Sequence, residues 1–148
     1  MLVYYVLAFG IGAIWALQPV INAGLAKSVG VFMASAISFG IGFLFLVAAV
    51  VVAQIFGEGT GNFSAASQIN IVYFLGGVIG ALVVLGMLFI VPKFGAGIAL
   101  SAAITGQLIM AALIDQFGLF GAPRIIMSPS RLLGIVLLLL GVNLVIKK

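Results

Sequence analysis

The chain has 148 residues, of which 66% are hydrophobic and 5% are charged, whereas about 25% of the residues in an ordinary soluble domain are charged. Six Lys or Arg and two Asp or Glu cannot cover a water-soluble monomer of this size, and the high hydrophobicity also excludes intrinsic disorder. Because Cys and His are absent, thiol catalysis, imidazole catalysis and the usual zinc ligand sets are excluded, and no metal or cofactor is expected. The composition predicts an integral membrane protein.

The few charges separate long apolar segments, which predict an all-α membrane protein with five transmembrane helices. Each uncharged segment is either about as long as the roughly 20 residues that cross a hydrocarbon core, or is flanked by Lys and Arg side chains that reach the interfaces. The runs lack the alternation of a membrane β-barrel. All five helices are expected to form one membrane domain over residues 1–148. The predicted spans cover residues 2–25, 31–56, 70–91, 96–115 and 130–147.

The first predicted helix carries the most informative polar cluster. At 100° per residue, Trp15, Gln18 and Asn22 share one face. Pro19 lies between them and cannot donate to the carbonyl of Trp15, which predicts a kink. These residues are candidates for contact with a solute near the middle of the membrane. The alternative is that both amides form hydrogen bonds between helices, which is common in membrane bundles.

Small residues on the third and fourth predicted helices favour close contact between backbones. A GxxxG pattern lies in the third helix, and a stripe with a spacing of four residues lies in the fourth. The residues assigned to helix packing are Gly76, Gly80, Gly97, Ser101, Thr105 and Gly106.

Two further polar residues lie on the fourth helix. Gln107 is deep enough to need a polar partner and is a candidate to support the solute site. Asp115 lies at the membrane boundary, where it is either a solvated charge paired with Arg124 or Arg131 or a residue that couples an ion to transport.

The charges also predict an orientation. Four basic residues fall on the C-terminal side and two on the N-terminal side, together with both acidic residues, which favours a cytoplasmic C-terminus. The basic residues on the C-terminal side are Lys27, Lys93, Lys147 and Lys148, and the charges on the other side are Glu58, Asp115, Arg124 and Arg131.

This bias is small enough to allow insertion in both orientations. An odd number of spans supplies one half of an inverted-repeat transporter, so the expected partner is an antiparallel copy of the chain or of a paralogue.

The residue types that the sequence lacks exclude several functions. No acidic residue lies deep in a predicted helix, which disfavours proton-coupled export of organic cations and leaves neutral or anionic solutes. Phosphate-binding loops, catalytic pairs and basic clusters for nucleic acid are also absent, so neither an enzyme nor a nucleic-acid-binding protein is expected.

Three segments resemble one bacterial family, the YdcZ-type proteins of the drug/metabolite transporter superfamily. They are QPVINAGLAKSVG at 18–30, PKFGAGIALSAAITGQLIMAALIDQFGLFGAP at 92–123 and SRLLGIVLLLLGVNLVI at 130–146. The resemblance implies the five-helix half-repeat of that superfamily, a role in transport and a location in the bacterial inner membrane. It also places Gln18, Asn22, Gln107, Asp115, Gly106 and Gly118 on the polar and glycine motif positions of the family. Gln116 stands where the family often has His, which argues against proton handling at that position.

The leading hypothesis is a secondary transporter or facilitator of a small organic solute, working by alternating access in an antiparallel dimer. The alternative is a non-transporting assembly partner or accessory subunit whose glycine-rich faces dock onto another membrane complex. A passive channel is disfavoured because few polar residues are present to line an aqueous pore.

Overall fold

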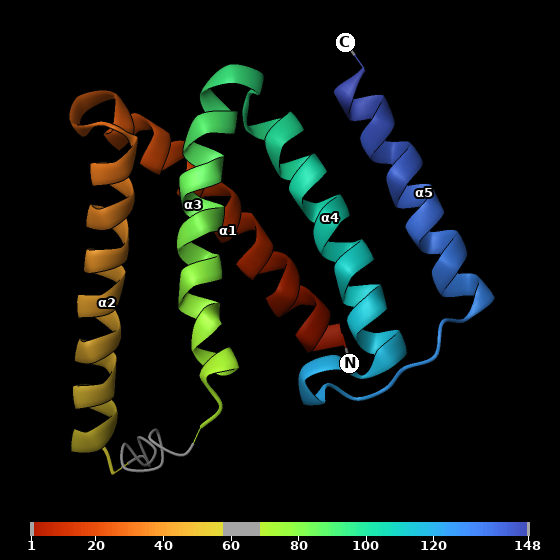
Figure 1. The fold of residues 1–148 in the computed structure, drawn as a ribbon, viewed down its shortest axis with the longest axis horizontal. Helices are drawn as coiled ribbons and strands as arrows, with labels where there is room; N and C mark the ends of the chain where they lie inside the picture. The colour runs from red at the N-terminus through yellow and green to blue at the C-terminus, as the bar shows by residue number, and fades with distance from the viewer. Residues whose placement is uncertain (1, 58–68, 148) are drawn as a thin grey trace. The chain divides into compact units, whose positions relative to one another are not determined.

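A computed structural model describes residues 2–57 and 69–147, so that Glu58 and Lys148 lie outside the described residues. The described part contains helices and turns and no strand (Figure 1). Five helical segments are long and apolar enough to cross a membrane, which confirms the predicted fold class of an all-α membrane protein. The elements are α1 (Leu2–Val29), α2 (Val31–Ile55), the 3-10 helix η2 (Ile71–Phe74), α3 (Leu75–Phe94), α4 (Ala96–Phe117), the 3-10 helix η3 (Leu119–Gly121) and α5 (Pro129–Ile146).

Two single glycines join consecutive helices. Gly30 lies between α1 and α2 and Gly95 between α3 and α4, and both have φ 83° and ψ 159°. Only glycine adopts this backbone conformation without steric strain, because a Cβ atom would clash with the peptide. The predicted spans left residues 26–30 and 92–95 between helices, whereas α1 continues to Val29 and α3 to Phe94, so that one glycine alone forms each connection.

The chain divides into two compact units, Met1–Pro92 and Lys93–Lys148. Each is described here by itself. That both belong to one membrane domain stays a prediction.

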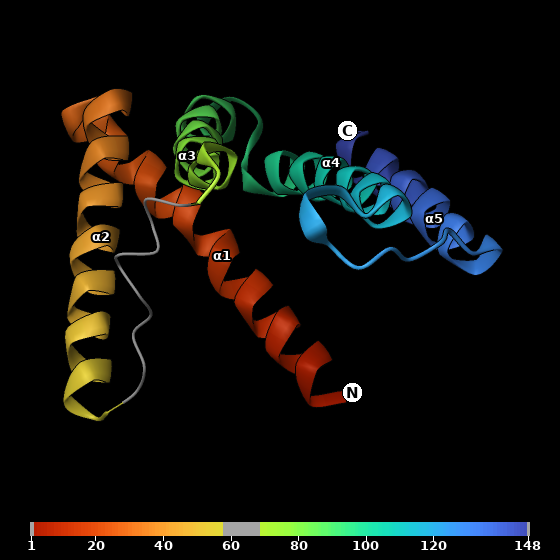
Figure 2. The same cartoon turned by 60° about the horizontal axis from the view of Figure 1, so that its bottom comes forward.

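In the first unit, α1, α2 and α3 meet close to Gly30. Ala34 of α2 is fully buried, and it clusters with Val84 and Leu88 of α3. The rings of Phe32 and Phe89 add an edge-to-face contact between α2 and α3, with centroids 6.3 Å apart and an interplanar angle of 74°. Away from this junction α1 and α2 diverge (Figure 2).

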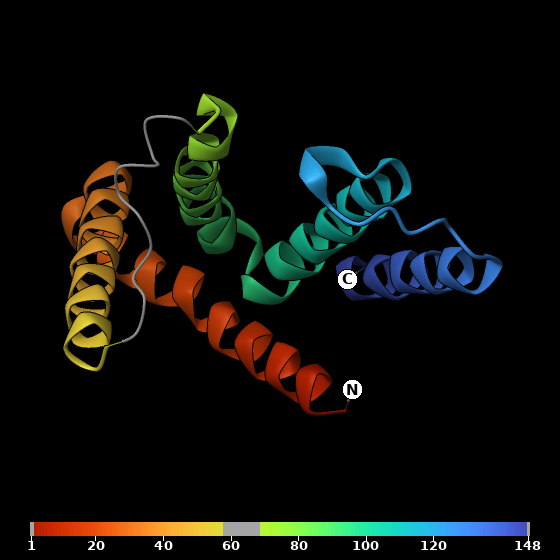
Figure 3. The same cartoon turned by 90° about the horizontal axis from the view of Figure 1, so that it is seen from below.

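In the second unit, α4 and α5 lie side by side (Figure 3). Gly118 ends α4 in the left-handed conformation, with φ 62°, and its N–H donates to the carbonyl of Ile114. A Cβ at this position would lie 3.3 Å from the carbonyl oxygen of Ala122, so glycine suits both the conformation and the space. Ser128 caps the start of α5 by accepting from the N–H of Arg131, 3.2 Å away.

Candidate functional site

The structure brings the polar cluster of α1 together against α3. Between the two helices lies a pocket with about 230 Å³ of space. The pocket is narrow, so that only about one water molecule fits inside it. We call it the α1 pocket. Its lining residues are Trp15, Gln18, Pro19 and Asn22 from α1 and Val83, Val84, Met87 and Leu88 from α3.

Asn22 is the buried polar residue of this pocket. Its side chain is 6% exposed, and its Nδ2 atom is fully buried and has no hydrogen-bond partner in the described part of the chain. Leaving a buried donor unpaired costs about 1–3 kcal/mol. An unpaired polar group is rare in native structures and indicates that a partner is supplied from outside the described chain.

Pro19 is buried beside Asn22, inside the continuous helix α1. Because proline has no N–H, the carbonyl of Trp15 lacks its usual donor from the fourth residue along the helix. The pocket therefore holds a side-chain donor without a partner in the described residues, and the backbone carbonyl of Trp15, one of its lining residues, cannot receive its usual helical hydrogen bond. A kink at Pro19 stays a prediction.

Gln18 lies where three hollows meet. It lines the α1 pocket, an open hollow of about 600 Å³ with Ile11, Ile14 and Trp15, and another of about 630 Å³ along α2. The second of these open hollows includes Ser38 and Gly42. Gln18 is exposed, and it lines the same pocket as the buried Asn22.

Gln107 belongs to the second unit and has an exposed side chain. Its role beside the α1 cluster stays a prediction.

The small residues differ in their surroundings. A Cβ added to Gly80 would lie 3.6 Å from the ring of Phe39 on α2, which is ordinary van der Waals contact. On α4, the hydroxyl of Thr105 donates to the carbonyl of Ser101 at 2.9 Å. A Cβ added to Gly76, Gly97 or Gly106 would have nothing within 4 Å, and packing roles for these three stay predictions.

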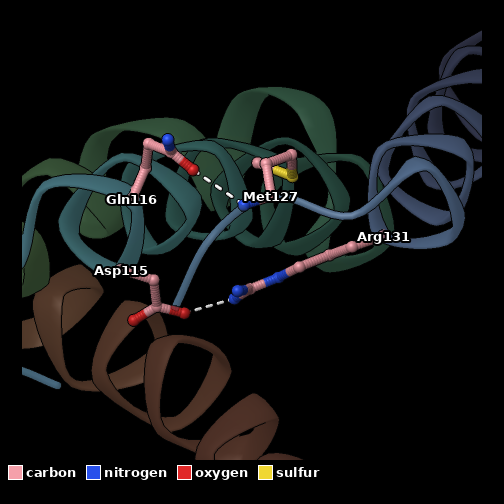
Figure 4. Close-up of polar contacts among 4 residues, drawn as sticks. All are labelled: Asp115, Gln116, Met127 and Arg131. Carbon is pink, nitrogen blue, oxygen red and sulfur yellow. Dashed lines mark hydrogen bonds and ion pairs between the residues drawn. The ribbon is translucent and has the colours of Figure 1, made fainter. Parts of the chain in front are cut away.

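The end of α4 is tied to the following loop and to α5 (Figure 4). Asp115 forms an ion pair with Arg131, and Gln116 Oε1 accepts from the backbone N–H of Met127 at 2.7 Å. The N–H of Ile125 donates to the carbonyl of Asp115 at 2.8 Å, and Arg124 Nε donates to the carbonyl of Gln116 at 3.2 Å. Sequence reasoning noticed Gln116 only as a replaced histidine, because a contact with a residue 11 positions away leaves no local signal.

The Asp115–Arg131 pair is expected to contribute modestly to stability. The side chains are 25% and 34% exposed respectively, so water screens part of their attraction. In a double-mutant cycle with Asp115→Asn and Arg131→Gln, we expect a coupling free energy of about 0.5–1.5 kcal/mol, measured by unfolding in mixed micelles. A coupling of zero would show that the pair does not hold α5 to α4.

The five apolar helices of the described residues define a multi-pass membrane protein. Residues 3–144 match the family model described as "Putative inner membrane exporter, YdcZ". The chain belongs to this family, which confirms the resemblance found in the sequence. It is accordingly a transporter-class protein of the inner membrane. No curated protein and no solved structure matches the chain.

Proposed function

We propose that the protein is a secondary transporter or facilitator of a small organic solute, neutral or anionic, working by alternating access in an antiparallel dimer. The observation that carries the proposal is the buried Asn22 Nδ2 atom of the α1 pocket, which has no hydrogen-bond partner in the part of the chain that the structure describes. Trp15 and Gln18 join Asn22 in the proposed site, and Gln107 supports it.

Size and symmetry support the proposed dimer. The α1 pocket has room for about one water, so most of an organic solute must lie outside it, where a second copy would enclose the solute. Five spans are an odd number, so a second copy in the inverted orientation would complete the pair of repeats that many transporters use. The partner is a second copy of the chain or a paralogue. The distribution of Lys and Arg favours a cytoplasmic C-terminus in the major orientation.

Reconstitution tests the transport function. We expect purified protein in liposomes to move at least one neutral or anionic solute faster than cationic solutes, and Gln18→Ala to reduce the flux. Single cysteines introduced into this cysteine-free chain should be labelled from both sides of the membrane if a homodimer is antiparallel.

The same experiment distinguishes the transporter from an accessory subunit. The accessory role is favoured by the open space beside Gly76, Gly97 and Gly106, where another membrane helix could pack. Absence of flux for every class, with Gln18→Ala unchanged in stability, would support the accessory role. Labelling of each site from one side only, in a chain that transports when expressed alone, would contradict the antiparallel dimer.

A further inference from the structure

The α1 pocket has polar groups of both kinds and no charged residue. Asn22 Nδ2 is a donor without a partner among residues 2–57 and 69–147, and the carbonyl of Trp15 lacks its helical donor because of Pro19. A single group that both accepts and donates hydrogen bonds would satisfy the two together. A hydroxyl is such a group, whereas an ammonium can only donate and a carboxylate can only accept.

The lining of the pocket favours neutral groups over charged groups. Its eight residues are uncharged, and the nearest ionisable side chain along α1 is Lys27, which is exposed at the end of the helix. Burying an ion without a counter-charge is strongly unfavourable in an apolar environment. A carboxylate or an ammonium would therefore lose more hydration free energy in this pocket than a neutral group.

The size of the pocket sets a further limit. Its room for about one water molecule matches a hydroxyl oxygen, while the body of a solute must lie elsewhere. The open hollow formed by Ile11, Ile14, Trp15 and Gln18 shares two residues with the pocket and is mainly apolar. An apolar body fits this hollow while its polar end enters the pocket.

We infer that the α1 pocket binds neutral, hydroxyl-bearing amphiphiles, with the hydroxyl oxygen accepting from Asn22 Nδ2 and the hydroxyl proton donated to the Trp15 carbonyl. This inference rests on the proposed function, because it narrows the solute from neutral or anionic to a neutral alcohol. Binding alone tests it, without any requirement for transport.

Trp15 is the single tryptophan of the chain and lines the pocket, so its fluorescence reports on occupancy. The probes are 4-bromobenzyl alcohol, 4-bromobenzylammonium, 4-bromobenzoate and 4-bromotoluene, because bromine quenches indole fluorescence and the four differ in one substituent. We expect saturable quenching by the alcohol, with a half-saturation concentration at least tenfold below those of the two ions. Bromotoluene should quench only in proportion to its partitioning into the membrane.

Variants connect the effect to the amide. Asn22→Leu keeps a similar volume and should raise the half-saturation concentration of the alcohol about tenfold, which corresponds to the loss of one hydrogen bond. Asn143→Leu replaces an exposed asparagine of α5 and should leave it unchanged. Circular dichroism and thermal melting verify that both variants are folded.

The inference is overturned if either ion binds as tightly as the alcohol, if Asn22→Leu leaves alcohol binding unchanged, or if no probe quenches saturably. The proposed function fails differently. Alcohol binding without flux in liposomes would contradict transport and leave the binding site supported. Solute flux that does not depend on Asn22 would support transport and contradict the binding site.

Discussion

Asn22→Leu is expected to reduce solute flux at least tenfold without lowering the free energy of unfolding. The Nδ2 atom of Asn22 is fully buried and has no partner in the described chain. Removing the amide should therefore leave stability unchanged or raise it by about 1 kcal/mol, because no hydrogen bond of the protein is broken. Flux should fall because the solute loses its donor. Transport into liposomes and unfolding in mixed micelles measure the two effects.

The same variant distinguishes the solute site from interhelical hydrogen bonding. If Asn22 instead pairs with a second copy, Asn22→Leu should lower stability by about 0.6–2 kcal/mol and shift the protein from dimer to monomer in detergent. Asn143→Leu serves as the matched control. Loss of both stability and the dimer, with the remaining flux scaling only with the amount of dimer, would contradict a direct role in solute binding.

Ala34→Leu is expected to destabilise the junction of α1, α2 and α3 by about 1–3 kcal/mol through overpacking. Ala34 is fully buried against Val84 and Leu88, so a larger side chain must displace one of them or separate α2 from α3. Since both neighbours also line the α1 pocket, the substitution should weaken solute binding as well. Unfolding in mixed micelles and Trp15 fluorescence measure these changes.

A control is available two residues along the same helix. Ala36 is exposed, so Ala36→Leu should change stability by less than about 0.5 kcal/mol. Equal effects of the two substitutions would show that the contact of Ala34 with α3 does not organise this unit.

Much of the fold was predictable because the hydrocarbon core of the membrane restricts the backbone conformation of every residue inside it. A backbone without water must satisfy its hydrogen bonds internally, so each long apolar run in this sequence becomes a helix. The helix ends were harder to predict. The first predicted span ended at residue 25, yet α1 continues to Val29, because Gly30 alone supplies the reversal through its positive φ.

The candidate site was predictable only in part. Helical periodicity alone places Trp15, Gln18 and Asn22 on one face. The four α3 residues that close the pocket lie more than 60 positions away in the chain, and apolar side chains in a uniformly apolar helix carry no signal of which neighbour they meet. The hydrogen bond between Gln116 and Met127 was unpredictable for the same reason, because it forms only when the loop folds back onto α4.

The sequence by itself determined that this protein has the five long apolar helices that the described residues contain, that the predicted spans hold no acidic residue deep inside them and that one face of α1 carries two amides. These properties follow from composition and helical periodicity. Only the tertiary structure decided that Gln18 is exposed, that Asn22 is buried with no partner for its Nδ2 atom among the described residues, and that Asp115 pairs with Arg131. The physical reason is that burial and pairing depend on which helix faces meet, which is set by packing between distant segments.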